Sequence, residues 1–189
     1  IVPKSVTAIG ASAFRNCTNL TSAIIPSSVT NIEADAFLYC YNLSSITVGS
    51  SVPFEWTSGN TFSNLANATL YVPAGSKFAY ESAAVWNEFK EIVEIENIAF
   101  ADSKVKEVCV SNWDTNGDGD LSYAEAAVVT TLGKAFKDNA GITTFNELQY
   151  FTALEKISGQ AFYNCSSIVS VVDLRGTVNN IGVNTFYKC

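Results

Sequence analysis

The sequence contains no histidine and no methionine, and only 15% of its 189 residues are charged. The lack of histidine removes the commonest general base, the usual partner in a catalytic triad and the commonest transition-metal ligand. Lysine and arginine total 11 against 18 aspartates and glutamates, a net charge of −7, and the basic residues are scattered. A nucleic acid or an anionic membrane surface requires a basic surface to bind it. We therefore expect neither nucleic acid nor a membrane as a partner.

Long apolar runs are also missing. No stretch approaches the ~20 consecutive apolar residues that cross a bilayer, and no signal peptide is visible. The chain begins with isoleucine and both of its ends fall within repeated sequence, so we expect a mature fragment or an excised segment. The missing targeting signal then says nothing about location. Hydrophobic residues make up 48% of the chain, which predicts a folded protein with a sizeable core.

What the sequence does contain is an internal repeat. Serine–valine, isoleucine, alanine–phenylalanine, cysteine and asparagine–leucine follow one another at fixed spacings in residues 5–22 and recur at the same spacings in residues 28–45. The pattern returns near the C-terminus around Phe162 and again around Phe186. A repeat of this length is typical of a solenoid, in which each unit buries its apolar face by stacking on its neighbours.

Within one repeat, the stretches 6–9 and 20–25 are rich in β-branched residues and predict short strands. Between them, Phe14, Cys17 and Leu20 lie three residues apart, which predicts a tight helical or 3₁₀ turn. Diverged copies that start at Phe62 and Phe136 keep the phenylalanine but replace the cysteine with leucine and asparagine. The repeat therefore occupies both flanks of the chain.

Four of the five cysteines occupy one repeat position, three residues after the phenylalanine: Cys17, Cys40, Cys165 and Cys189. Equivalent positions of a solenoid stack, and a small apolar thiol suits a buried ladder. The alternative is a disulfide between neighbouring units, which requires favourable geometry. Cys109 is expected on the inner face of a helix, and the absence of a Cys-x-x-Cys pair argues against zinc.

The middle of the chain interrupts the repeat. Residues 72–95 begin with a Val-Pro-Ala-Gly-Ser turn and carry Trp86, Phe89 and Val93 at a spacing of three and four, which predicts a helical face. We expect this segment to cap a first array, because terminal units must cover the last apolar layer. An aromatic binding patch is the alternative. A second module begins near residue 97, with helices predicted over residues 101–113 and 123–130.

Between these two helices lies the one motif with clear chemistry. Residues 114–125, DTNGDGDLSYAE, fit the calcium-loop pattern D-x-[DN]-x-[DN]-G-x₅-E at every specified position. Calcium takes six to eight oxygen ligands, and acidic residues at alternate loop positions with a glutamate at position 12 supply most of them. The predicted ligands of one Ca²⁺ are Asp114, Asn116, Asp118, Asp120 through its backbone carbonyl, Ser122 directly or through water, and Glu125.

A polar, glycine-rich surface turn is the alternative for this loop. Without an ion, however, its four carboxylates would repel one another over a short distance. We expect a structural role for calcium, because calcium sensors generally use paired loops and a methionine-rich groove. This chain has one such loop and no methionine.

The repeat IPSSVTNIEADAFLYCYNLSSITV (residues 25–48) resembles the BspA-like leucine-rich repeat family of bacterial surface proteins. Residues 72–95 are similar to the segment that often closes such arrays. The stretch NWDTNGDGDLSYAEAAVVTTL, followed by ELQYFTALEKI, is similar to the calcium-loop segment that opens others. Residues 52–70 depart most from the pattern. The resemblance implies a secreted or surface-anchored bacterial protein associated with adhesion, but it transfers no ligand-contacting residues.

The expected fold is an α+β repeat solenoid with two short arrays. Residues 1–95 form the first array and its cap, and residues 96–189 contain the calcium segment (101–131) and the second array (132–189). The expected function is a non-catalytic extracellular interaction or adhesion module that binds a protein or glycan. The surface strand positions Ser22, Ser45, Thr47 and Ser170 are small and polar, which fits exposure.

Three alternatives remain. An architectural spacer would hold another domain away from the cell. A dockerin-type anchor normally needs two calcium loops ending in aspartate, whereas this chain has one ending in glutamate. A glycan- or peptide-processing enzyme would have to use paired carboxylates, or a serine or cysteine activated by lysine. The densest carboxylates are already assigned to the metal loop.

Overall fold

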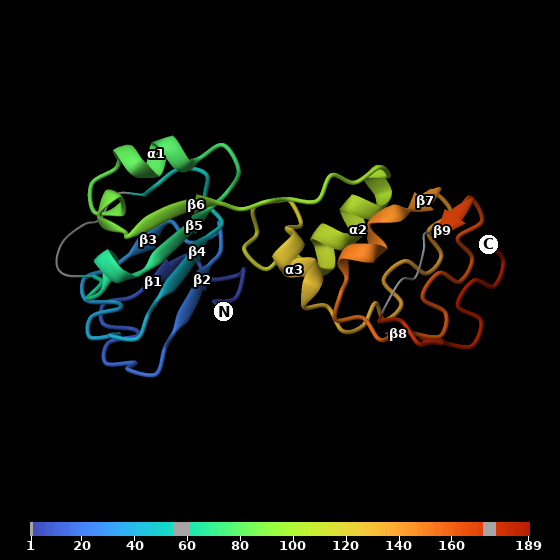
Figure 1. The fold of residues 1–189 in the computed structure, drawn as a ribbon, viewed down its shortest axis with the longest axis horizontal. Helices are drawn as coiled ribbons and strands as arrows, with labels where there is room; N and C mark the ends of the chain where they lie inside the picture. Colours follow the sequence, from blue (N-terminus) through green and yellow to red (C-terminus); the bar gives the residue numbers. More distant parts are fainter. Residues whose placement is uncertain (1, 55–60, 172–176) are drawn as a thin grey trace. The chain divides into compact units, whose positions relative to one another are not determined.

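The computed structural model describes residues 2–54, 61–171 and 177–189. The chain divides into two compact units, Ile1–Glu96 with Thr115–Asp118, and Asn97–Asp114 with Gly119–Cys189. Both units consist of short strands, turns and a few short helices (Figure 1). The first unit contains β1 (Ala8–Ile9), β2 (Ser22–Ile25), β3 (Asn31–Ile32), β4 (Ser45–Val48), η1 (Leu65–Asn67), β5 (Thr69–Val72), α1 (Lys77–Ser82), η2 (Trp86–Glu88) and β6 (Glu91–Glu94).

Four parallel strands of the first unit form a sheet in the order β2-β4-β5-β6 (Figure 1). Ser22 pairs with Ser45, and Ser45 pairs with Thr69. The pairing therefore joins equivalent positions of successive repeats, as the sequence period predicts. Alternate strand residues point inward, so that Ile25 and Val48 are buried.

The repeated phenylalanines stack in a column. The Phe14 and Phe37 ring centroids are 4.9 Å apart, and those of Phe37 and Phe62 are 5.0 Å apart, with nearly parallel planes. Phe62 belongs to the diverged copy that lost its cysteine, so this copy still continues the ladder. Part of that copy, residues 55–60, lies outside the described residues. A second column in the other unit contains Phe136, Phe162 and Phe186, with centroid separations of 5.1 and 5.2 Å.

The cysteine position is also explained by stacking. The Sγ atoms of Cys40, Cys165 and Cys189 each donate a hydrogen bond of 3.0 Å to the backbone carbonyl of the ladder phenylalanine in the preceding repeat. All five cysteines are free thiols. Burial raises the pKa of the Cys40 and Cys165 thiols. The expectation of buried thiols is confirmed for these two and for Cys109. Cys17 is half-buried and Cys189 is exposed.

The prediction of one helical face over residues 72–95 is wrong for Val93. The segment forms α1 and the short 3₁₀ helix η2, and then returns to the sheet as β6, where Val93 pairs with Tyr71. The buried rings of Tyr80 and Trp86 meet edge to face at 5.1 Å. The Tyr80 hydroxyl donates a hydrogen bond to the Ser50 carbonyl, and the Trp86 indole N–H donates one to the carbonyl of residue 54. The apolar periodicity of this segment therefore reflects two successive elements that share one core.

The second unit contains α2 (Ser103–Trp113), α3 (Tyr123–Ala127), β7 (Thr144–Phe145), η3 (Asn146–Tyr150), β8 (Lys156–Ile157), β9 (Ser170–Val171) and β10 (Asn180–Ile181). Both helices are shorter than predicted. The first begins at Ser103 because Asp102 caps it, and the second ends at Ala127. The strands pair in parallel as β7 with β9 and β8 with β10. Within the described residues, no helix has the length and apolar character needed to span a membrane.

Candidate functional site

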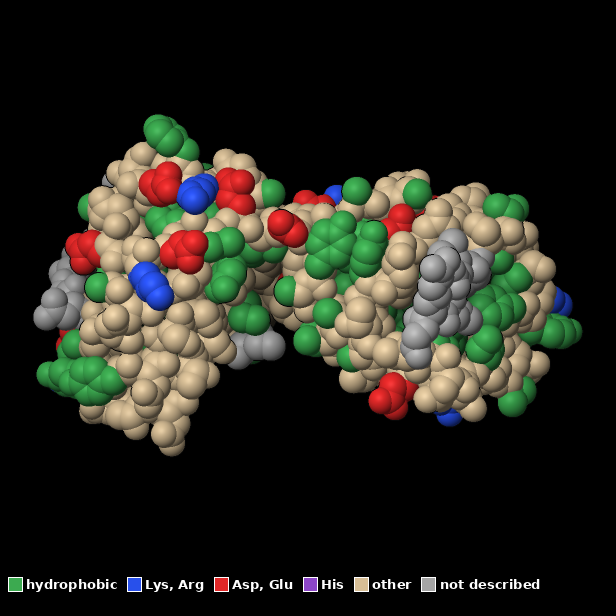
Figure 2. Space-filling model, in the orientation of Figure 1, with side chains coloured by type: hydrophobic (Ala, Val, Ile, Leu, Met, Phe, Trp, Pro, Cys, Tyr) green, Lys and Arg blue, Asp and Glu red, His purple; other side chains and the backbone are tan. Residues whose placement is uncertain are grey.

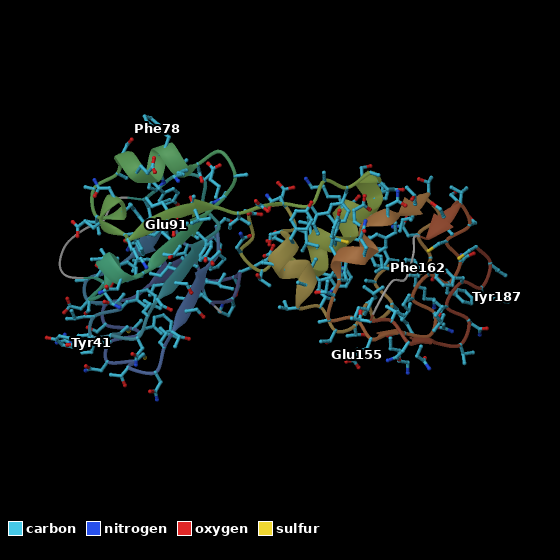
Figure 3. The ribbon with its side chains drawn as sticks, in the orientation of Figure 1. Tyr41, Phe78, Glu91, Glu155, Phe162 and Tyr187 are labelled. Atoms are coloured by element: carbon cyan, nitrogen blue, oxygen red, sulfur yellow. The ribbon has the colours of Figure 1, made fainter. Side chains whose placement is uncertain are left out.

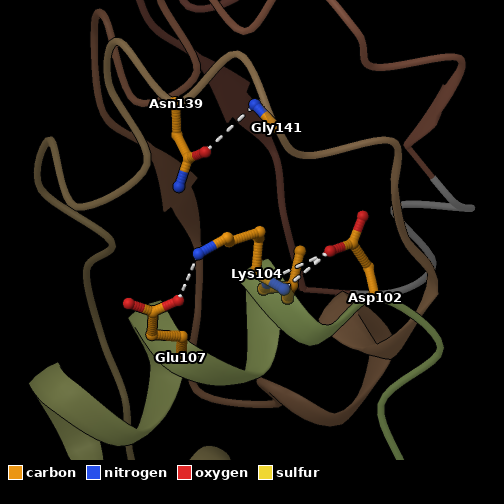
Figure 4. A network of polar contacts seen from close by, with 6 residues as sticks. Asp102, Lys104, Glu107, Asn139 and Gly141 are labelled. Atoms are coloured by element: carbon orange, nitrogen blue, oxygen red, sulfur yellow. Dashed lines mark hydrogen bonds and ion pairs between the residues drawn. The ribbon is translucent and has the colours of Figure 1, made fainter.

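The predicted calcium loop connects α2 to α3, and the position of α2 depends on Asp102. The Asp102 Oδ1 atom accepts hydrogen bonds from the backbone N–H groups of Lys104 (2.8 Å) and Val105 (3.3 Å), which caps the helix (Figure 4). Its Oδ2 atom accepts from the Thr143 N–H and hydroxyl, both at 2.8 Å. Burial raises the pKa of this carboxyl group, but the hydrogen bonds from Thr143, Lys104 and Val105 outweigh burial and lower the pKa to about 2.

The first half of the loop turns sharply around Asp114. This side chain is buried, and its Oδ2 atom accepts a hydrogen bond of 3.2 Å from the Gly119 N–H. Gly119 has a φ of +89° and Gly117 a φ of +71°, a region that glycine enters without steric cost. The glycines of the motif therefore allow the chain to wrap around the Asp114 carboxylate.

Asn116 and Asp118 lie side by side. The Asn116 Nδ2 atom donates to Asp118 Oδ2 at 2.9 Å, and the Asp118 N–H donates to Asn116 Oδ1 at 3.0 Å. Both residues belong to the first compact unit. There the backbone N–H of Ser27 donates to the Asn116 carbonyl at 2.9 Å. A side chain at Gly49 would collide with the same carbonyl, because an added Cβ would lie 1.9 Å from it.

The second half of the loop forms the start of α3. The Ser122 hydroxyl accepts from the Glu125 N–H, and the Glu125 carboxylate accepts from the Ser122 N–H at 3.0 Å and hydroxyl at 2.8 Å. This reciprocal arrangement is a capping box. The Asp120 carboxylate forms an ion pair with Lys106 of α2.

The structure thus brings predicted ligands together in two pairs, Asn116 with Asp118 and Ser122 with Glu125. Throughout the described part of the chain, no three aspartate, glutamate or cysteine side chains converge as a metal-binding group. The chemistry of the donors fits calcium, because the loop offers carboxylate, amide, hydroxyl and carbonyl oxygens. Asp114 and Asn116 are both buried although their side chains are polar. A turn that only faced solvent would leave such side chains exposed.

A second candidate site is the outward face of the β2-β4-β5-β6 sheet. Its side chains form two cross-strand rows set by the register. One row contains Ser22, Ser45, Thr69 and Glu91, and the other contains Ile24, Thr47, Tyr71 and Val93. Most members of both rows are exposed or half-buried, and Tyr71 is 38% exposed. In Figure 2, charged side chains gather over the upper part of the first unit, and the surface over β2 and β4 carries few of them.

Sequence reasoning identified Ser22, Ser45 and Thr47 on this face, but it missed Tyr71, Glu91 and Val93. Strand β6 was not predicted because a helical face was expected to run through Val93. The run Glu91-Ile92-Val93-Glu94 nevertheless contains two β-branched residues between polar ones, which is a signal for a strand. Ser170, the fourth predicted surface position, is exposed in the other unit, where its hydroxyl lies 3.0 Å from that of Thr144.

The model of the BspA-type leucine-rich repeat region matches residues 1–112 and 129–189 of this chain, in six copies. The unmatched residues 113–128 contain the whole acidic loop and all of α3. No curated protein matches the chain.

Proposed function

The chain belongs to the BspA-type leucine-rich repeat family, whose members are typically non-enzymatic surface modules that interact with proteins, and we propose that this one is an extracellular adhesion module. Its partner is a host or neighbouring-cell protein or a glycan, and its location is the surface of a bacterium. Two short solenoid arrays carry the function, with residues 72–95 as the cap of the first array.

The observation that carries this proposal is the outward sheet face of the first unit. Serine and threonine hydroxyls there provide hydrogen-bond donors and acceptors at the regular spacing of a parallel sheet. Tyr71 adds a large half-exposed ring at the centre of the four strands. Tyrosine is enriched among residues that dominate binding energy, since it offers apolar area and a hydroxyl at a low entropic cost.

Calcium has a supporting role in the proposal. Asp114, Asn116, Asp118, Ser122 and Glu125 would supply side-chain oxygens and Asp120 its backbone carbonyl. The ion would supply positive charge that offsets repulsion among the loop carboxylates. The proposed role is structural, because the loop directly connects helices α2 and α3.

The non-catalytic assignment follows from the residue inventory. Histidine is absent, and the Cys109 thiol is inert because burial raises its pKa. An architectural spacer is the alternative, and it predicts the same fold with no specific partner. Hydrolysis of a substrate in a panel of glycans and peptides by the purified chain would contradict the assignment.

Binding to immobilised matrix proteins, to glycans and to bacterial or host cells tests the adhesion proposal. Tyr71→Ala should weaken binding to whichever partner is found by about 5- to 30-fold, the effect of removing a hot-spot aromatic side chain. Phe78→Ala is the matched control, because Phe78 is 81% exposed on α1 and projects away from Glu91 and the sheet (Figure 3). Absence of any partner would favour the spacer, and equal effects of both substitutions would place binding elsewhere.

Thermal unfolding with excess calcium or with a chelator tests the metal site. Calcium at a free concentration of about 100 times its Kd should raise the free energy of unfolding of the unit that binds it by about 2.7 kcal/mol. The double variant Asp114→Ala/Glu125→Ala should lose this difference. Because Glu125 also caps α3, the comparison is made between calcium and chelator within each variant. The control Glu81→Ala/Glu155→Ala removes two exposed carboxylates elsewhere and should retain the calcium effect. An equal response in both double variants would contradict a site in the loop.

A further inference from the structure

The sheet of the first unit ends at β6, in the middle of the chain. Strand β6 pairs with β5 on one side, and no described strand lies on its other side (Figure 1). On the paired side, the Ile95 N–H donates to the Val72 carbonyl at 2.8 Å. Because backbone groups alternate in direction along a strand, the N–H and carbonyl groups of Ile92 and Glu94 point the opposite way, toward the free edge.

This free edge is open to a groove. Throughout the described residues, no atom is hydrogen-bonded to the backbone N–H or carbonyl of Ile92 or Glu94. A groove of about 260 Å³ lies between α1 and the strand, with Lys77 and Glu81 on one side and residues 90–92 on the other. Helix α1 is held beside the strand, because the Lys77 N–H donates to Glu94 Oε1 at 3.1 Å. The edge can therefore be reached from the groove.

The strand is negatively charged. Its sequence is Glu-Ile-Val-Glu, and the exposed Glu91 continues the outward row that contains Ser45 and Thr69. Like charges placed opposite one another destabilise a strand pair, whereas opposite charges stabilise it. Pairing of two β6 strands from separate copies would bring glutamates together, and charged residues on an edge strand disfavour such self-pairing. A basic residue on an incoming strand would be attracted instead.

We propose that β6 binds an extended segment of a partner protein, which adds a fifth strand to this four-stranded sheet. The main chain of such a segment satisfies the unpaired N–H and carbonyl groups, which is a common mode of peptide recognition at sheet edges. The segment carries a lysine or arginine opposite Glu91 and a β-branched residue opposite Val93. Both side chains then continue the outward rows set by the register of β5 and β6.

This inference goes beyond the proposed function, because the edge recognises a main chain and does not depend on Tyr71. Strand β5, which carries Tyr71, lies between β4 and β6 and contributes no backbone group to the edge. Peptide binding at the edge and adhesion through the Tyr71 face can therefore fail independently of each other.

Fluorescence anisotropy with a labelled peptide, Thr-Val-Thr-Lys-Thr-Val-Thr, tests the site. A valine stands two residues from the lysine on both sides, so the peptide fits in either chain direction. Glu94→Pro removes one edge N–H and places a ring at the edge, and it should weaken binding by about 10-fold or more. Glu94→Ala is the matched control. It loses the same contact with Lys77 but keeps the N–H, so it should bind like the unmodified chain. Circular dichroism verifies that both variants are folded.

Peptide variants keep the test independent of the folding of Glu94→Pro. One peptide is N-methylated at the lysine and both valines, and another at the two threonines beside the lysine. One of the two should lose binding and the other should retain it, because a strand at an edge bonds through alternate residues only. Replacing the peptide lysine with glutamate should weaken binding by about 2- to 10-fold, and Glu91→Lys should reverse this preference.

Lack of saturable binding by the unmodified chain overturns the proposal. Equal affinities of Glu94→Pro and Glu94→Ala, or equal effects of the two N-methylated peptides, overturn it too, since either result means that the edge groups are not used. Tighter binding of the glutamate peptide would place the attraction at Lys90. Dimerisation of the unmodified chain that Glu94→Pro abolishes, measured by sedimentation velocity, would assign the edge to a second copy instead of a partner segment.

Discussion

Asp102 shows how one side chain can hold two distant segments of the chain. Its two carboxylate oxygens accept hydrogen bonds from the first turn of α2 and from Thr143, 41 residues away. Because the side chain is only 8% exposed, removal of its oxygens would leave buried N–H groups without partners. The neighbouring Lys104–Glu107 ion pair of 2.8 Å is exposed, and such pairs contribute little to stability (Figure 4).

Asp102→Ala should lower the free energy of unfolding at pH 7 by about 1–3 kcal/mol, the combined effect of a lost helix cap and unpaired buried donors. The pKa of this carboxyl group is lowered from 3.8 to about 2, so its contribution is present above pH 4 and is lost as the pH falls through 2. Urea unfolding of both chains at pH 7, 4 and 2 measures this. The difference between them should shrink toward pH 2.

Glu107→Gln is the control for Asp102→Ala, and it should change stability by less than about 0.5 kcal/mol. A loss as large as that of Asp102→Ala, or a difference between the unmodified and Asp102→Ala chains that does not depend on pH, would contradict the role assigned to the Asp102 carboxylate.

At the level of elements, the repeat places the same residue type in different surroundings. Gly10 and Gly182 both lie four residues before a ladder phenylalanine. A Cβ at Gly10 would have no neighbour within 4 Å among the described residues. A Cβ at Gly182 would lie 2.3 Å from the Gly159 backbone nitrogen in the preceding repeat. The tight approach of two backbones therefore requires glycine at position 182 but not at position 10.

Gly182→Ala should lower the free energy of unfolding by about 1–3 kcal/mol, because the added methyl group forces the two repeats apart. Gly10→Ala should be neutral or stabilising by about 0.4–1 kcal/mol, since alanine reduces the entropy of the unfolded chain at a site with room for it. Thermal or urea unfolding of the two variants measures both changes. Equal effects would mean that the repeats are not packed as described.

At the scale of the whole molecule, each compact unit has its own hydrophobic core. Leu70 belongs to the first core and Leu154 to the second, and both are fully buried. The two cores have no residue in common. A unit with its own core generally opens as its own cooperative unit.

Leu70→Ala and Leu154→Ala should each destabilise the unit that contains the substitution by about 2–5 kcal/mol. Hydrogen exchange measured by mass spectrometry should show faster exchange in peptides of that unit, with little change in the other. Acceleration throughout the chain by both substitutions would indicate one cooperative structure.

The amino-acid sequence by itself determined the repeat, its strands and the positions that stack, because a side chain that recurs at a fixed period must meet its equivalent in the neighbouring repeat. It also determined the glycines and oxygen donors of residues 114–125. Only the tertiary structure decided that Glu91–Glu94 forms a strand, because the sheet already formed by β2, β4 and β5 offers β6 a partner that local periodicity does not reveal. The same holds for Asp102, whose partner Thr143 lies 41 residues away, and for the different neighbours of Gly10 and Gly182.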